Sequence, residues 1–279
     1  MVVFLNGQLV PEDQAVVSVF DRGFLYGDGL FEGVRIFNGK PFRWEQHLER
    51  FQRGADFLKI QPPFPPEALR CFADQLISQN QMTDSFLRLM VSRGVGIRGY
   101  SPKGAERPTL VMSLHPVPAS GPLPRWRLVS APFRLPANEP LSQFKTCNKL
   151  LQILARAHAA AAGADEALLL NTEDRVVEAT SSNLFWLAGR AVCTPPLAAG
   201  VLPGVTRAVV FDLCRTLGLA VRETSLRLVD LGSAQGIFLS LTSVGLAEGQ
   251  SLNGRTLERS PVVPELSRAY WDLVREETG

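Results

Sequence analysis

The chain has few of the residues that metal sites and disulfide frameworks require. Its 279 residues include four cysteines and three histidines, all scattered and without a C-x-x-C pair, so we expect neither a metal site nor disulfides. No apolar run reaches membrane-spanning length, and the N-terminal residues lack the basic segment of a secretory signal. The net charge of +2 comes without a basic run, which argues against nucleic-acid or membrane-surface binding. We therefore expect a soluble cytoplasmic protein.

Lysine is also scarce, with five lysines against 24 arginines. One of them, Lys145, precedes an apolar segment with helical spacing, and Glu178 lies in an otherwise uncharged segment typical of a strand. A lysine amine can form a Schiff base with an aldehyde cofactor, and a buried acid can keep a pyridine nitrogen protonated. The pair therefore indicates pyridoxal 5'-phosphate chemistry, although Lys145 alone is more typical of a solvated helix start.

Length and proline content indicate two domains. A chain of 279 residues with 46% hydrophobic residues exceeds the usual single domain and can bury a large core. Four prolines between residues 116 and 124 cannot sustain a helix or a central strand. We expect a smaller α/β domain at residues 1–115, a linker at residues 116–125 and a larger domain at residues 126–279.

The expected first domain alternates strands and helices, which is typical of α/β architecture. Asn-Gly pairs at 6–7 and 38–39 predict hairpin turns, and helical spacing predicts helices at Glu45–Phe57 and Pro66–Gln79. The expected strands are Val2–Leu5, Gln8–Val10, Phe31–Phe37, Phe86–Ser92 and Thr109–Leu114.

In the second domain, helices are expected from about Cys147 to Ala162 and at Val205–Leu217. The first should bury an apolar stripe of Leu150, Leu151, Leu154 and Ala155. The expected strands are Trp126–Ser130, Glu166–Leu170, Val176–Glu178, Leu184–Leu187 and Ala191–Thr194.

Three places could hold a phosphate group. The glycine loop Leu202–Arg207 opens a helix, so the amides of Val205 and Thr206 could bind an anion, although an ordinary helix cap is equally consistent. Arg50 offers a guanidinium, which in such positions is more often a surface ion pair.

The third place is the glycine-rich segment 94–99, which matches G-x-G-x-x-G. A dinucleotide site needs a helix to begin there, and the segment 100–104 cannot supply one, so we reject a Rossmann site at this motif. A nicotinamide dehydrogenase stays a third alternative, which failure to bind any dinucleotide would remove. Arg93 and Arg98 on this loop could instead reach a substrate carboxylate, or simply be solvated.

Several motifs together resemble the fold-type IV pyridoxal phosphate enzymes, which include branched-chain aminotransferases, D-amino acid aminotransferases and aminodeoxychorismate lyases. They cover nearly the whole chain in the family's order, namely Asp21–Arg35, His47–Phe51, Phe144–Lys145, Glu178–Phe185 and Leu202–Arg207. The resemblance implies a two-domain D-amino acid aminotransferase-like fold of α/β (α+β) class, with the cofactor between the domains. It also implies a homodimer.

The resemblance assigns roles to individual positions. Lys145 resembles the Schiff-base lysine and general base, and Glu178 resembles the partner of the pyridine nitrogen. The implied phosphate contacts are Arg50, Val205, Thr206 and Thr242, with Leu202 packed against the ring. The implied substrate contacts are Tyr26, Phe31, Gly33, Arg88, Arg98 and Ser243.

Two positions separate the family's activities. Lys149 stands where branched-chain enzymes carry a tyrosine, which is closer to the lyases, whereas Glu32 and Gly33 occupy the place where lyases carry a threonine. We expect an aminotransferase acting on branched-chain-like or D-amino acids and a 2-keto acid. The alternatives are a 4-amino-4-deoxychorismate lyase, which releases pyruvate, and a non-catalytic binding protein on the same fold.

Overall fold

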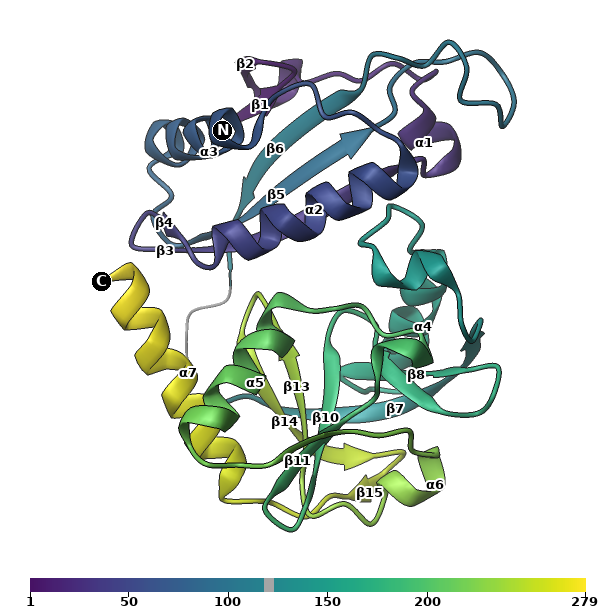
Figure 1. Cartoon of the computed structure of the whole chain (residues 1–279), viewed down its shortest axis with the longest axis vertical. Helices are drawn as coiled ribbons and strands as arrows, with labels where there is room; N and C mark the ends of the chain where they lie inside the picture. Colours follow the sequence, from purple (N-terminus) through teal and green to yellow (C-terminus); the bar gives the residue numbers. More distant parts are fainter. Residues whose placement is uncertain (118–122) are drawn as a thin grey trace. The chain divides into compact units, whose positions relative to one another are not determined.

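The computed structural model describes residues 1–117 and 123–279, which divide into two compact units (Figure 1). The first unit contains Met1–Pro118, Phe144–Asn148 and Glu276–Gly279, and the second contains Ala119–Gln143 and Lys149–Arg275. Two short segments that we expected in the second domain, 144–148 and 276–279, therefore belong to the first unit. Residues 118–122 of the expected linker 116–125 lie outside the described residues.

The first unit is built on a six-stranded antiparallel sheet in the order β2-β1-β6-β5-β3-β4. Two long helices, α2 and α3, pack on this sheet (Figure 1). The elements are β1 (Val2–Leu5), β2 (Gln8–Pro11), α1 (Arg22–Tyr26), β3 (Gly29–Phe37), β4 (Lys40–Pro41), α2 (Trp44–Leu58), α3 (Pro66–Asn80), β5 (Ser85–Ser92) and β6 (Thr109–His115).

Both expected hairpin turns of the first unit are present. Asn6 and Gly7 join β1 to β2, and Asn38 and Gly39 join β3 to β4. All four residues have positive φ, between 49° and 98°, which is the conformation that a two-residue turn between right-twisted strands requires. Asparagine and glycine tolerate that conformation better than other residues.

Strand β3 has two faces with different roles. Leu30, Val34 and Ile36 are buried in one hydrophobic core together with Phe51 and other residues of α2 and α3. Because successive side chains of a strand alternate between faces, Phe31 and its neighbours at odd positions point to the face opposite the helices. The strand thus has one face for the core and one for the candidate site.

The second unit contains a nine-stranded mixed sheet, of which β12-β11-β10-β13-β14-β7-β8-β9 form the main order and β15 pairs with β14. Its strands are β7 (Arg125–Leu135), β8 (Glu166–Asn171), β9 (Val176–Ala179), β10 (Asn183–Ala188), β11 (Ala191–Thr194), β12 (Val221–Glu223), β13 (Ile237–Leu241), β14 (Gly245–Leu252) and β15 (Arg255–Thr256). Its helices are α4 (Leu150–Ala161), α5 (Val205–Thr216), α6 (Leu228–Leu231) and α7 (Val262–Thr278), whose last residues join the first unit.

One extra pairing closes part of this sheet on itself. Strand β9 pairs with β10 as well as with β8, so the strands β10, β13, β14, β7, β8 and β9 form a continuous ring. The register of the closing pair sets Glu178 directly opposite Asn183. The closure therefore fixes one of the expected cofactor residues at a seam of the ring.

Helix α4 differs from its prediction in extent and in the face that it buries. It begins at Leu150, not near Cys147. The predicted stripe is wrong at two positions, since Leu150 is 68% and Leu154 42% exposed, whereas Ala155 and Ala159 are fully buried against β7 and β8. Small alanine side chains let the helix lie close to the sheet, whereas Leu150 and Leu154 are left exposed.

Among the described residues, no helix combines the length and apolar character that a membrane crossing requires.

Candidate active site

The segment Phe144–Asn148 extends the first unit's sheet at the start of β3. The amide of Phe31 donates to the carbonyl of Lys145 over 2.9 Å, and the amide of Cys147 donates to the carbonyl of Gly29 over 2.9 Å. Lys145 is therefore held by strand-like pairing rather than by a helix, since α4 begins only at residue 150. These two backbone hydrogen bonds, one at the carbonyl of Lys145 and one at Cys147, restrict where its amine can reach.

The amine of Lys145 lies beside an aromatic ring. Its Nζ is 4.7 Å from the centroid of the Phe31 ring, and the guanidinium carbon of Arg88 is 4.2 Å from the same centroid. Arg88 pairs with Gly33 across β3 and β5, where a Cβ on Gly33 would come within 2.2 Å of the Phe86 ring. The structure thus brings together four of the expected site residues.

Arg50, which we expected in a phosphate contact, forms a buried ion pair with Glu32 of β3. Its Nε and Nη2 donate to the two carboxylate oxygens over 2.8 and 2.7 Å. The Nδ1 atom of His47, one turn earlier on α2, lies 2.9 Å from the same carboxylate. All three side chains are at most 5% exposed. Sequence reasoning missed Glu32 as the partner of Arg50, although an acid inside an apolar strand was a usable signal.

The charges of this cluster are set by competing effects. Burial by itself would raise the pKa of Glu32, but the Arg50 guanidinium and the His47 hydrogen bond outweigh it and hold that pKa at about 2. Burial lowers the pKa of His47, and the positive charges of Arg50 and Lys145 lower it further. The hydrogen bond and negative charge of Glu32 raise this pKa but do not outweigh them. The cluster therefore consists of a carboxylate, a guanidinium and a neutral imidazole that donates from Nδ1.

In the second unit, Glu178 is held at the seam between β9 and β10. Its Oε2 accepts hydrogen bonds from the amide of Leu202 over 3.1 Å and from Nδ2 of Asn183 over 3.3 Å. The same Asn183 amide group donates to the carbonyl of Leu202 over 2.9 Å. A Cβ on Gly204 would lie 2.0 Å from Asn183 Oδ1, so only glycine lets the loop pass this close.

Helix α5 begins immediately after that loop. Its N-cap is Gly204, and no side chain caps its first amides. Val205 and Thr206 are the first two helical residues and are 8% and 6% exposed. Uncapped amides at a helix N-terminus carry partial positive charge and attract anions. Glu178 is thus linked, through Leu202, to the N-terminus of a helix that begins only three residues further along the chain.

Two further expected residues, Thr242 and Ser243, lie in the turn between β13 and β14. Strand β10 begins at Asn183, which pairs with Ser240 near the end of antiparallel β13, so this turn leaves the sheet at the edge where Glu178 is held. In the described part of the chain, the buried hydroxyls of Ser182 and Ser240 have no hydrogen-bond partner. Unsatisfied hydroxyls at this edge fit a site that binds a polar group.

The remaining expected residues have different surroundings. The hydroxyl of Tyr26 accepts a hydrogen bond from the amide of Gly99 over 3.1 Å. Arg98 is exposed, and within residues 1–117 and 123–279 it makes no hydrogen bond or ion pair. Lys149 is half-buried at the N-cap position of α4, and its carbonyl accepts the amide of Ile153 over 2.9 Å.

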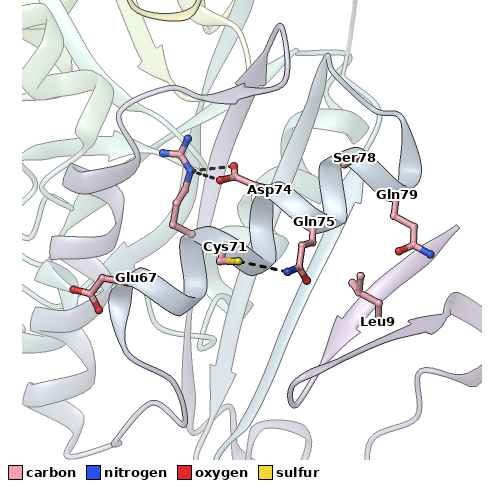
Figure 2. A pocket seen from close by; sticks show the side chains of 8 residues that line it. Leu9, Glu67, Cys71, Asp74, Gln75, Ser78 and Gln79 are labelled. Carbon is pink, nitrogen blue, oxygen red and sulfur yellow. Dashed lines mark hydrogen bonds and ion pairs between the residues drawn. The ribbon is translucent and has the colours of Figure 1, made fainter.

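A separate depression of about 730 Å³ lies on the surface of α3 (Figure 2). It contains an ion pair between Arg70 and Asp74, and Gln75 Nε2 lies 3.4 Å from Cys71 Sγ. None of the expected site residues lines it. The lining residues are Leu9, Glu67, Arg70, Cys71, Asp74, Gln75, Ser78 and Gln79.

Solved structures define the class of this fold. The chain matches a branched-chain aminotransferase of Thermoproteus uzoniensis, solved with norvaline, with a TM-score of 0.93 and 27% identity over 99% of this chain and 95% of that one. It also matches a branched-chain amino acid aminotransferase from a T.th. strain, solved with pyridoxamine 5'-phosphate, with a TM-score of 0.90 and 26% identity over 98% and 93% of the two chains. The predicted two-domain aminotransferase-like fold is confirmed.

Sequence comparison gives the family. The model of the class IV amino-transferases matches residues 29–252, and the chain belongs to this family. Relatives include a Methanocaldococcus jannaschii protein provisionally named a branched-chain-amino-acid aminotransferase (35% identical, covering 94% of this chain and 91% of the relative). The D-alanine aminotransferase of Listeria innocua is 30% identical, covering 100% of this chain and 98% of the relative. The aminodeoxychorismate lyase of Bacillus subtilis is 31% identical, covering 79% of this chain and 76% of the relative. The predicted family and its aminotransferase class are confirmed.

Proposed function

We propose that this chain is a pyridoxal 5'-phosphate-dependent aminotransferase that moves an amino group between an α-amino acid and a 2-keto acid. The observation that carries the proposal is the placement of Lys145, whose backbone is fixed to β3 and whose Nζ lies 4.7 Å from the Phe31 ring centroid. Because the backbone of Lys145 is fixed, its Nζ can occupy only a limited region, as a Schiff-base lysine of a class IV amino-transferase requires.

The residues of the second unit fit the two polar ends of the cofactor. Glu178, held by the Leu202 amide and by Asn183, is suited to keep a proton on the pyridine nitrogen. The uncapped amides of Val205 and Thr206 are suited to bind the phosphate. Arg50, the Thr242 hydroxyl and Leu202 complete the proposed cofactor contacts.

When bound, the cofactor supplies an aldehyde that captures amines and a ring that accepts an electron pair from the substrate α-carbon. Lys145 acts as the general base, and its Nζ moves the proton that leaves the substrate α-carbon. Glu178 stabilises the charge that develops in the ring by holding the pyridine nitrogen protonated. The low pKa of Glu32 keeps Arg50 paired at every physiological pH.

The substrate pocket is proposed to involve the odd-numbered face of β3 and the glycine-rich loop after β5. Phe31, Gly33 and Arg88 meet on that face, and Tyr26 contacts the loop. Exposed Arg98 is the proposed cation for the substrate carboxylate, with Ser243 as a second contact. This pocket is proposed to accept branched-chain-like or D-amino acids.

An amino-donor panel tests the activity. Purified protein with pyridoxal 5'-phosphate and 2-oxoglutarate is incubated with L- and D-amino acids, and glutamate formation is measured. We expect transfer from at least one branched-chain or D-amino acid, and no transfer by Lys145→Ala. Release of pyruvate from aminodeoxychorismate without any amino transfer would show a lyase instead, which Lys149 in place of the branched-chain enzymes' tyrosine would then explain.

We further propose a homodimer. The segment 16–25 of the first unit exposes apolar side chains to 44–76%, namely Val16, Val17, Val19, Phe20, Phe24 and Leu25. An apolar stretch of this kind is typical of a protein interface. A cytoplasmic location is also proposed, since the four cysteines are scattered along the sequence without a C-x-x-C pair, which is not the pattern of a disulfide-stabilised secreted protein.

A further inference from the structure

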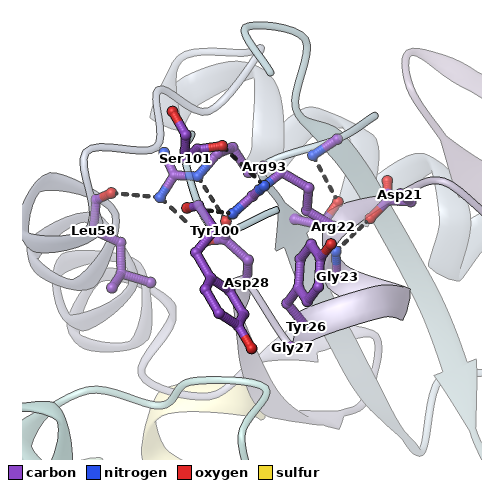
Figure 3. A network of polar contacts seen from close by, with 12 residues as sticks. Asp21, Arg22, Gly23, Tyr26, Gly27, Asp28, Leu58, Arg93, Tyr100 and Ser101 are labelled. Atoms are coloured by element: carbon purple, nitrogen blue, oxygen red, sulfur yellow. Dashed lines mark hydrogen bonds and ion pairs between the residues drawn. The ribbon is translucent and has the colours of Figure 1, made fainter. Parts of the chain in front are cut away.

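A network of charges in the first unit centres on Asp28, which lies between α1 and β3 (Figure 3). Its Oδ2 accepts hydrogen bonds from Nε of both Arg22 and Arg93, each over 2.8 Å, and its Oδ1 accepts from Nη2 of Arg93 over 3.1 Å. Arg22 is 4% exposed. Two arginines are therefore oriented by one carboxylate.

Arg22 uses the rest of its guanidinium to hold the loop that carries Arg98. Nη1 donates to the carbonyls of Gly99 and Ser101 over 2.8 and 3.1 Å, and Nη2 donates to the carbonyl of Tyr100 over 3.1 Å. These are the three residues directly after Arg98. Because a planar guanidinium offers its donors in a fixed geometry, three consecutive carbonyls bound to one group determine the course of the backbone there.

Arg93 connects the same carboxylate to the end of α2. Its Nη1 donates to the carbonyl of Lys59 over 3.0 Å. Its Nη2 donates to the carbonyl of Leu58 over 2.8 Å (Figure 3). The last carbonyls of a helix lack intrahelical partners and attract cations. Asp28 thus joins the Arg98 loop to the helix that carries His47 and Arg50.

The glycine-rich sequence of the loop is explained by this packing. A Cβ on Gly96 would lie 3.0 Å from Cδ of Arg22 and 2.9 Å from Cβ of Ala105. A Cβ on Gly94, where φ is +85°, would lie 1.8 Å from the carbonyl oxygen of Arg107. The G-x-G-x-x-G pattern therefore makes room for the Arg22 side chain and for a close backbone approach, and a nucleotide site is not needed to explain it.

We propose that Arg22, oriented by Asp28, is a positioning residue that fixes the loop so that Arg98 can bind the substrate carboxylate. Arg22 donates every hydrogen bond described above to protein atoms, so it acts through Arg98 and not on the substrate. The inference rests on the proposed function, in which Arg98 is the carboxylate-binding cation.

A double-mutant cycle on the holoenzyme tests this role. KM and kcat are measured with L-leucine or D-alanine, whichever is turned over, at saturating 2-oxoglutarate, for Arg22→Gln, Arg98→Gln and the double variant. Since hydrogen bonds from charged groups are among the stronger ones, we expect KM for the amino acid to rise about 10-fold in each single variant, with kcat changed less than about 3-fold. The double variant should be no worse than Arg98→Gln, because coupled residues are not additive.

Amide hydrogen exchange over residues 94–105 provides a readout that does not depend on activity. Arg22→Gln should exchange faster there than wild type. Asp28→Asn should likewise raise KM for the amino acid and speed up the exchange of these amides. If Arg22→Gln does not fold, Asp28→Asn takes its place in the cycle. Arg70→Gln is the matched control, since it removes an arginine bound to one exposed aspartate on α3 and should leave KM and exchange unchanged.

The outcomes separate this inference from the function on which it rests. A raised KM in Arg98→Gln beside an unchanged KM in Arg22→Gln and Asp28→Asn overturns only the positioning role. Additive effects in the double variant, or unaltered exchange over 94–105, overturn it as well. An unchanged KM in an active Arg98→Gln enzyme removes Arg98 as the carboxylate ligand and this inference with it, whereas wild type without any amino transfer overturns the proposed function too.

Discussion

Replacing Glu32 by glutamine should destabilise the first unit strongly, because the Arg50 charge would remain buried without its counter-charge. Breaking a buried ion pair from one side costs about 3–5 kcal/mol. The pKa of Glu32 gives a second route to the magnitude. Each pKa unit is worth about 1.36 kcal/mol, so lowering the pKa from 4.5 to about 2 corresponds to about 3 kcal/mol. The two routes agree, and full burial of the group removes the need to discount for solvent.

The pH dependence follows from the sign of the same shift. The pKa of Glu32 is lower in the folded state than in the unfolded chain, so its contribution is fully present above about pH 4.5 and is lost as the pH falls towards about 2. Wild type should therefore exceed Glu32→Gln in stability by about 3 kcal/mol at pH 7, and the difference should shrink between pH 4.5 and pH 2.

Urea unfolding without added cofactor, at a series of pH values, measures this difference. The control is Glu49→Gln, which neutralises an exposed glutamate of the same helix and should change the free energy of unfolding by less than about 0.5 kcal/mol. Equal stabilities of the two variants at pH 7, or a difference from wild type that does not depend on pH, would refute the reasoning about the buried cluster.

Three more changes have defined outcomes. Glu178→Gln should lower kcat by about 10²-fold or more, because the pyridine nitrogen loses the negative charge that keeps it protonated. Steady-state kinetics at saturating cofactor measures this, and a kcat within about 3-fold of wild type would exclude Glu178 as the partner of the pyridine nitrogen. Gly204→Ala places a Cβ 2.0 Å from Asn183 Oδ1, so the loop must shift and cofactor affinity, measured by absorbance titration, should fall; unchanged affinity would contradict the close packing. Phe24→Ser removes a ring that is 76% exposed and should shift the molar mass from light scattering towards the monomer, whereas an unaltered mass would place the interface elsewhere.

Local signals in the sequence predicted much of the fold. The Asn-Gly turns after β1 and β3 follow from backbone conformations that few other residues tolerate. Helices α2 and α3 lie within two residues of their predicted bounds, because each buries one apolar face at helical spacing. These features depend on neighbouring residues, and a pattern of neighbours is what a single sequence displays.

Features set by distant residues were less accessible. Pairing of Phe144–Asn148 with the start of β3 joins residues more than 100 positions apart, and no local pattern encodes it. The burial of Ala159 and the exposure of Leu154 depend on how closely α4 approaches β7 and β8. The partner of Arg50 became visible only when β3 and α2 were placed together, since Glu32 and Arg50 are 18 residues apart.

The motifs named most of the candidate site residues but not their surroundings. Asn183, which holds Glu178 and lies against Gly204, was part of a quoted motif without a role. Arg22 and Asp28 were likewise only members of a motif, although they organise the Arg98 loop. Hydrogen-bonded support of this kind depends on three-dimensional placement, and residue type alone does not reveal it.

Chemical labelling tests the central claim, that the amine of Lys145 carries the cofactor. Holoprotein reduced with borohydride should lose its visible absorption band, and mass spectrometry after digestion should find the pyridoxyl group on the peptide that contains Lys145. Lys145→Ala treated in the same way should carry no label. A label on Lys149 or on any other residue of the wild-type protein, or no label at all, would contradict the account.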